Sequence, residues 1–162
     1  MTEPARILVV DDTPVALRLM EALLKRAGFD QLRFAASADE AFAALALDDE
    51  NSDATVDLVL LDVMMPKIDG IEACRRIKTV VRYEDVPIVM VTTLDSANHL
   101  TAAFEAGASD YVTKPVEPVE LVARVRAALR HKAALDRRRE RERELTVRLE
   151  EAERRLGKSS AI

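Results

Sequence analysis

Short apolar runs alternate five times with longer amphipathic stretches along the chain. The runs lie at residues 6–10, 32–36, 57–61, 88–91 and 110–113. Between them, apolar residues recur every three or four positions, which is the period of a helix with one buried face. Strands that alternate with helices in this way favour a parallel sheet covered on both faces. The expected fold class is therefore α/β, with a doubly wound five-stranded parallel sheet.

Turn and capping residues bound the expected helices. Pro14 stands in the first turn of the first helix and Gly28 follows its end. Ser37 is a candidate N-cap, and Glu40 follows at the spacing of a capping box. The helices are expected over about 14–27, from Ser37, over about 71–80, over about 96–106, and from Pro118 onward.

Composition fits a globular protein without a membrane segment. Hydrophobic residues make up 49% and charged residues 33% of the chain. The single cysteine, Cys74, excludes an internal disulfide, fits a reducing compartment, and is expected to serve packing. No apolar run approaches the ~20 residues that a bilayer-spanning helix needs, and the N-terminus leaves no room for a signal peptide. A cytoplasmic protein with no membrane partner is expected.

Charge divides the chain into two parts. Residues 1–115 hold 11 basic against 20 acidic residues, whereas residues 116–162 hold 13 against 9. Basic and acidic residues are interleaved in the second part, which favours a solvated or coiled-coil face over a nucleic-acid patch. We expect no direct contact with nucleic acid.

The C-terminal part predicts one long helix. No Pro or Gly occurs between Pro118 and Gly157, so the helix could reach ~60 Å. A helix this polar is marginal alone in water, and a partner helix would stabilise it. We expect a homodimer through a parallel two-stranded coiled coil. Its apolar stripe would consist of Leu135, Leu145, Leu149, Ala152 and Leu156.

Polar residues follow four of the five expected strands. They are Asp11 and Asp12 after the first, Asp62 after the third, Thr92 after the fourth and Lys114 after the fifth. Each alone has an ordinary explanation, as a helix cap, a turn residue, a strand residue or a solvated lysine. Ligands of doubly wound sheets bind outside the carboxyl ends of the strands. Together, these residues therefore indicate phosphate or metal chemistry at that edge.

Three carboxylates in one crevice repel each other unless a cation joins them. A hard divalent ion with oxygen ligands meets this need, and Mg²⁺ is the ion we expect. Lys114 can offset charge on a phosphoryl oxygen, and the Thr92 hydroxyl can hydrogen-bond another. Phosphoryl transfer needs mainly positioning and charge stabilisation, and a carboxylate can serve as its covalent nucleophile.

The motifs together resemble the receiver domains of response regulators, over about residues 5–130. The matching segments are Ile7-Leu8-Val9-Val10-Asp11-Asp12, Leu60-Leu61-Asp62-Val63-Met64-Met65-Pro66, Asp69-Gly70, Val91-Thr92, and Ala106-Gly107-Ala108-Ser109-Asp110-Tyr111-Val112-Thr113-Lys114-Pro115. Any one of them is a weak pattern, but their order and spacing are specific. The resemblance implies a flavodoxin-like sheet in the order 2-1-3-4-5, a receiver domain at 1–130, and a helical extension at 131–162.

The resemblance also implies a function in two-component signalling rather than an enzymatic one. Asp62 would take a phosphoryl group from a sensor histidine kinase or a phosphotransfer protein. Mg²⁺ would be bound by Asp12, Asp62 and the backbone carbonyl of Met64, with Asp11 acting largely through water. Thr92 and Tyr111 would form a switch pair that controls dimerisation or a downstream output. The Lys114-Pro115 bond would be cis.

Four residues at the site depart from the usual pattern or could tune it. Thr93 stands where a smaller residue is usual, and Lys67 replaces a frequent Gly. Met64 and Leu94 are apolar at positions that, by resemblance, influence attack by water. All four could change the rates of phosphorylation or dephosphorylation.

Three other functions remain open at this point. A haloacid-dehalogenase-type phosphatase needs two aspartates spaced by one residue after the first strand, where Asp11 and Asp12 are adjacent. A flavodoxin-like electron carrier needs a phosphate loop rich in Ser, Thr and Gly at the same place. A scaffold could use the coiled coil alone. The chain could also be a free-standing regulator, or a receiver and linker cut from an output domain.

Overall fold

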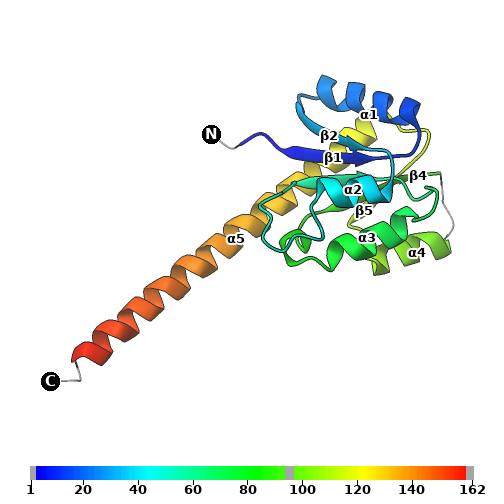
Figure 1. The fold of residues 1–162 in the computed structure, drawn as a ribbon. Helices are drawn as coiled ribbons and strands as arrows, with labels where there is room; N and C mark the ends of the chain where they lie inside the picture. Colours follow the sequence, from blue (N-terminus) through cyan, green and yellow to red (C-terminus); the bar gives the residue numbers. More distant parts are fainter. Residues whose placement is uncertain (1–2, 94–96, 160–162) are drawn as a thin grey trace.

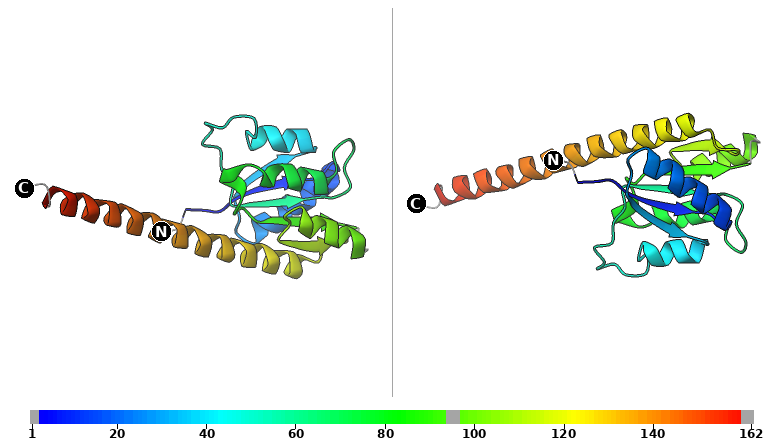
Figure 2. Two further views of the ribbon diagram at one scale, coloured as in Figure 1. Left: turned by 90° about the horizontal axis from the view of Figure 1, so that it is seen from below. Right: turned by 90° about the horizontal axis from the view of Figure 1, so that it is seen from above.

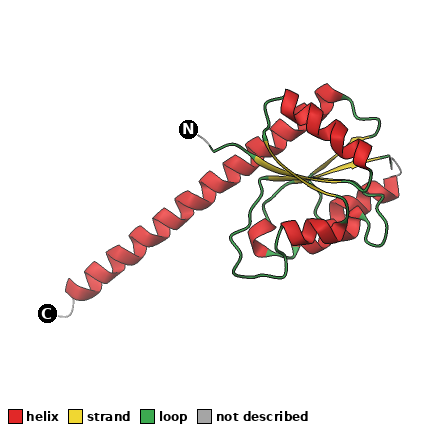
Figure 3. Cartoon of the chain, turned by 45° about the horizontal axis from the view of Figure 1, so that its top comes forward, coloured by secondary structure: helices red, strands yellow, loops and turns green. Residues whose placement is uncertain are grey.

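The computed structural model describes residues 3–93 and 97–159. Five parallel strands form one sheet in the order β2-β1-β3-β4-β5, with helices on both faces (Figures 1 and 3). The elements are β1 Arg6–Val10, α1 Pro14–Arg26, β2 Gln31–Ala35, α2 Ala38–Ala44, β3 Leu58–Leu61, α3 Gly70–Lys78, the 3₁₀ helix η1 Val81–Tyr83, β4 Ile88–Thr92, α4 Ala97–Glu105, β5 Asp110–Thr113 and α5 Pro118–Ser159. The expected fold class and strand order are confirmed.

The pleat of the sheet separates two hydrophobic cores. Side chains alternate between the faces of a strand, so Ile7 and Leu60 pack with Leu24 of α1 and Leu121 of α5. Their strand neighbours pack with α2, α3 and α4 on the other face. All four residues of β3 are buried, as the nearly continuous apolar run predicted for a strand covered on both sides.

Helix α2 begins with the predicted cap. The Glu40 amide donates to Ser37 Oγ at 3.1 Å, and the Ala36 amide donates to Glu40 Oε2 at 2.7 Å. The short helix η1 was not predicted. It places Tyr83, which is fully buried, with its hydroxyl 2.6 Å from the Leu45 carbonyl and 2.9 Å from that of Ala54. This hydroxyl ties the polar loop after α2 to the body of the fold.

Helix α5 belongs partly to the body and partly to solvent. Leu121 and Val125 are buried against the sheet, whereas every residue from 140 to 159 is exposed. The exposed part extends away from the body in all views (Figures 1 and 2). Gly157 does not end the helix, which runs to Ser159. Neither α5 nor any other helix in the described residues has the length and apolar content to cross a bilayer.

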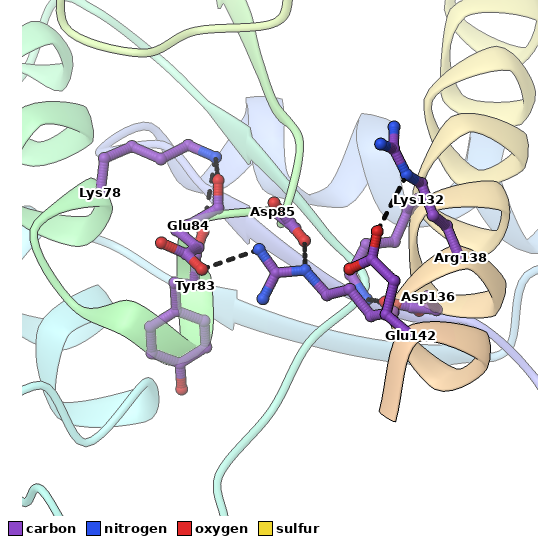
Figure 4. Close-up of polar contacts among 9 residues, drawn as sticks. Lys78, Tyr83, Glu84, Asp85, Lys132, Asp136, Arg138 and Glu142 are labelled. Carbon is purple, nitrogen blue, oxygen red and sulfur yellow. Dashed lines mark hydrogen bonds and ion pairs between the residues drawn. The ribbon is translucent and has the colours of Figure 1, made fainter. Parts of the chain in front are cut away.

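An ion-pair cluster marks the place where α5 leaves the body. Arg139 Nη2 lies 2.8 Å from Glu84 Oε1, and Arg139 Nε lies 2.5 Å from Asp85 Oδ2. Lys78 of α3 donates to the Glu84 carbonyl at 3.1 Å (Figure 4). It also donates to the Val86 carbonyl. Exposed pairs of this kind contribute little to stability, because solvent screens the two charges. The segment before β4 is thus held by α3 on one side and by α5 on the other.

The burial of Cys74 generates the first prediction. Its side chain is fully buried in α3, and this burial raises the pKa of the thiol to about 11. Because the thiolate is the reactive form, we expect the native chain to resist iodoacetamide at pH 8 and to react rapidly in guanidinium. Mass spectrometry measures the labelling. Val147→Cys, at an exposed position, is the control and should label at the rate of a free thiol. Fast labelling of Cys74 in the native chain would contradict this account.

Candidate functional site

The carboxyl ends of the strands bring the predicted polar residues to one edge of the sheet. Asp11 and Asp62 directly follow β1 and β3, Thr92 ends β4, and Lys114 directly follows β5. All but Lys114 are buried, at 3% exposure for Asp11, 5% for Asp62 and 2% for Thr92. Burial of two carboxylates side by side is costly unless positive charge accompanies them.

Lys114 supplies positive charge between the two buried carboxylates. Its Nζ lies 2.7 Å from Asp11 Oδ2 and 3.3 Å from Asp62 Oδ2. The second oxygen of Asp11 accepts a hydrogen bond from the Thr13 amide at 2.9 Å. The second oxygen of Asp62 accepts one from the Met64 amide at 3.3 Å. The lysine thus joins β5 to the ends of β1 and β3, and among the described residues both contacts of the Asp62 carboxylate measure 3.3 Å.

The electrostatics of the site show an excess of negative charge. Burial raises the pKa of Asp62, the charge of Lys114 lowers it, and the charge of Asp11 raises it again, with a net rise. Burial alone would lower the pKa of Lys114. The hydrogen bond to Asp11 and the charges of both aspartates outweigh this, so the pKa rises above its ordinary value. Lys114 therefore stays protonated, and the site would gain from a further cation.

The acidic cluster fits a magnesium ion. One carboxylate oxygen from each of Asp11, Asp12 and Asp62 lies within 4.8 Å of the others. Ligand oxygens on a Mg²⁺ octahedron are roughly 3–4 Å apart, so small side-chain movements would complete the arrangement. Asp12 is exposed. The backbone carbonyl of Met64 as a further ligand stays a prediction, as does the action of Asp11 through water.

Gly70 is a residue of the site that the sequence indicated only within the Asp69-Gly70 match to receiver domains, without a role. Its amide donates to the Val63 carbonyl at 2.9 Å. A Cβ at this position would lie 2.1 Å from the backbone oxygen of Asp62, far inside any possible contact. The start of α3 therefore lies directly against the backbone of Asp62, the residue that follows β3. The residue types at Asp69-Gly70 are typical of a turn. They do not indicate that the backbone of α3 approaches Asp62 closely.

Thr92 and Tyr111 lie on either side of a small cavity. It measures about 10 Å³, and its lining includes Val63, Leu100 and Phe104. The ring of Tyr111 meets that of Phe104 edge to face, with centroids 6.3 Å apart. The cavity is far too small for a tyrosine ring. Leu100 and Phe104 of α4 thus line the space next to Thr92 and Tyr111.

The departures from the usual pattern have different structural settings. Lys67 is exposed and has a φ of 66°, in the left-handed region that costs a non-glycine residue about 1–2 kcal/mol. Thr93 is exposed, and Met64 is 57% exposed. Leu94 lies outside the described residues. The Lys114-Pro115 peptide bond is cis, as the resemblance implied.

Comparisons with known proteins agree with this geometry. The family described as "Response regulator receiver domain" matches residues 7–126. The response regulator PleD of Caulobacter vibrioides is 41% identical over 138 residues, which cover 85% of this chain and 29% of PleD. The transcriptional regulatory protein YvrH of Bacillus subtilis is 39% identical, over 79% of this chain and 50% of YvrH. The chain thus spans half or less of the length of these curated relatives.

Solved structures show the same fold. A putative response regulator from Chloroflexus aurantiacus is 37% identical, with a TM-score of 0.70 over 78% of this chain and 98% of that chain. The receiver domain of an HD domain-containing protein from Pseudomonas fluorescens is 28% identical, with a TM-score of 0.72 over 82% of this chain and 99% of that chain.

Gly70→Ala tests the close approach of α3 to Asp62. The added methyl must displace the Asp62 carbonyl or the helix start, and we expect a loss of about 1–3 kcal/mol in the free energy of unfolding. Urea denaturation measures it. Gly157→Ala is the matched control, because its Cβ would meet nothing within 4 Å. Equal midpoints for Gly70→Ala and the wild type would refute the close approach.

Proposed function

The chain belongs to the response regulator receiver domain family of two-component systems, and on this premise we propose that Asp62 is its phosphoacceptor. The observation that carries the proposal is the contact of Lys114 Nζ with both Asp62 and Asp11 at the carboxyl edge of the sheet. Receiver domains are generally signalling modules, and we assign this one no separate enzymatic activity. The phosphatase and electron-carrier alternatives find no support in the family match.

The proposed reaction moves a phosphoryl group from a phosphohistidine to Asp62. A carboxylate oxygen attacks phosphorus, a P–O bond forms, and the P–N bond breaks as the imidazole leaves with its electron pair. Lys114 offsets negative charge on the phosphoryl oxygens, and the Thr92 hydroxyl donates a hydrogen bond to one of them. Asp12, Asp62 and the Met64 carbonyl would hold Mg²⁺, with Asp11 acting through water. When bound, Mg²⁺ neutralises charge on the transferred group.

The proposed response is a shift between two packings of α4 and β5. When Thr92 turns toward the phosphoryl group, space opens for Tyr111 to move inward, and α4 must adjust because the cavity between them is small. A local contact then biases a pre-existing equilibrium. The changed surface next to Tyr111 would control an output or the association of receivers.

We assign the phosphoacceptor unit to residues 1–130 and a helical extension to residues 131–162. The proposed donor is a sensor histidine kinase or a phosphotransfer protein, and the proposed setting is the cytoplasm. Support for the boundary comes from burial, since the last fully buried residue of α5 is Val125 and exposure is continuous from residue 140 to 159.

Asp62→Asn tests the phosphoacceptor directly. We expect acetyl phosphate with Mg²⁺ to add one phosphoryl group to the wild type and none to Asp62→Asn, because the amide is not a nucleophile for this reaction. Intact-mass spectrometry measures the adduct. Asp57→Asn is the matched control, since Asp57 lies at the other end of β3 and pairs with Arg6. It should be labelled normally. Labelling of Asp62→Asn at the wild-type rate would show that Asp62 is not the phosphoacceptor.

Asp12→Ala tests the cation site. We expect the dissociation constant for Mg²⁺ to rise at least roughly tenfold and phosphorylation to fall with it. Asp11→Ala should act in the same direction and less strongly. Isothermal titration calorimetry measures the affinity, and EDTA should stop labelling of the wild type until Mg²⁺ is restored. Asp48→Ala, at an exposed loop position, is the control. Unchanged Mg²⁺ affinity in Asp12→Ala would show that the ion binds elsewhere.

A further inference from the structure

The exposed half of α5 carries large apolar side chains that no other described residue covers. Leu145, Leu149 and Leu156 are 63%, 62% and 71% exposed. Charged residues make up most of the remaining surface of this segment, so the leucines form a narrow stripe. An isolated helix of this length is marginal in water unless a face is packed. The stripe therefore points to a partner helix.

The stripe has coiled-coil spacing and faces away from the receiver body. Leu149 and Leu156 occupy a positions of a heptad, and Leu145 and Ala152 occupy d positions. At about 100° per residue, this seam lies roughly 120° around α5 from the side that carries Leu121 and Val125 into the core. A second helix can thus reach the seam without meeting the body of its own chain.

Contacts with the body set the point where the seam can begin. Arg139 is held by Glu84 and Asp85, and exposure is continuous from residue 140 to 159. Arg138 and Glu142, at the preceding d and a positions, form an ion pair of 3.3 Å within the helix. The continuous apolar layers therefore start only at Leu145, ten residues after Leu135, where the complete stripe begins.

We propose that the seam Leu145, Leu149, Ala152 and Leu156 binds the same seam of a second copy of this chain, as a parallel, in-register two-stranded coiled coil. The occupant is a second copy because Arg148 and Glu153, which flank the seam on opposite sides, complement the same two residues of another copy. The inference does not depend on phosphorylation of Asp62.

Charge decides between parallel and antiparallel pairing. Arg141, Arg148 and Arg155 occupy the g positions on one flank, and Glu153 occupies an e position on the other. In the parallel arrangement, Arg148 faces the partner's Glu153, and the pair occurs twice by symmetry. In the antiparallel arrangement with the same leucines packed, Arg148 faces the partner's Arg155. Within the described part of the chain, neither Arg148 nor Glu153 has an ion-pair partner of its own.

The first experiment tests the seam. Sedimentation of the full chain should show a monomer–dimer equilibrium, and Leu149→Asp should raise the dissociation constant at least roughly 100-fold. Val147→Asp is the matched control, because Val147 is 52% exposed on the roughly opposite side of the same helix. It should leave the constant within about twofold, and circular dichroism compares the helix content of both variants.

The second experiment tests the orientation at low salt. Arg148→Glu should raise the dissociation constant roughly 3- to 10-fold by turning two attractions into two repulsions. Adding Glu153→Arg in the same chain should restore it. An antiparallel dimer predicts the opposite sign for Arg148→Glu, because repulsion from the partner's Arg155 is relieved.

Several outcomes would overturn the proposal. A full chain that stays monomeric at high micromolar concentration would leave the stripe to another protein. A trimer or larger assembly would also contradict the two-stranded coiled coil. Equal effects of Leu149→Asp and Val147→Asp on the dissociation constant would contradict the proposed seam. Tighter association of Arg148→Glu would contradict the parallel arrangement.

Discussion

One ammonium group holds the carboxyl edge of the sheet together. Lys114 Nζ touches Asp11 and Asp62, so three strands meet at a single charge. Without it, two buried carboxylates would lie side by side with no compensating charge from the chain. The strand order brings the two carboxylates together, because β3 lies between β1 and β4 and Asp62 is therefore next to Asp11. Gly70 adds a steric limit, since α3 begins against the Asp62 carbonyl. The site is thus fixed by one charge and one close contact.

Sequence patterns predicted the features that local chemistry determines. Apolar runs gave the strands, Ser37 and Glu40 gave a cap, and the strand ends gave the acidic cluster. Contacts between residues far apart in the chain leave no such local pattern. The ion pairs of Arg139 with Glu84 and Asp85 could not be predicted for this reason. The fit of Gly70 against Asp62 depends on how closely the backbone of α3 approaches β3, which the residue types do not reveal. The same holds for η1, whose three residues are too few to show a period.

Helix α5 joins two environments without a break. Its first turns complete a core shared with α1, and its last turns meet only solvent in a single chain. Leu121 and Leu149 lie on different faces of the same helix, and Leu121 contacts the core whereas Leu149 is exposed. The change from core packing to solvent exposure lies between Val125 and residue 140, and no turn or loop interrupts α5 between Pro118 and Ser159.

The length of the free part of α5 gives it the properties of a lever arm. Residues 140–159 span about 30 Å at 1.5 Å per residue, so a tilt of ~5° at the fulcrum carries the tip by ~2.6 Å. The fulcrum is the guanidinium of Arg139 against Glu84 and Asp85, and these contacts are exposed. Small changes near β4 can therefore become displacements at the tip that exceed the side-chain shifts that cause them.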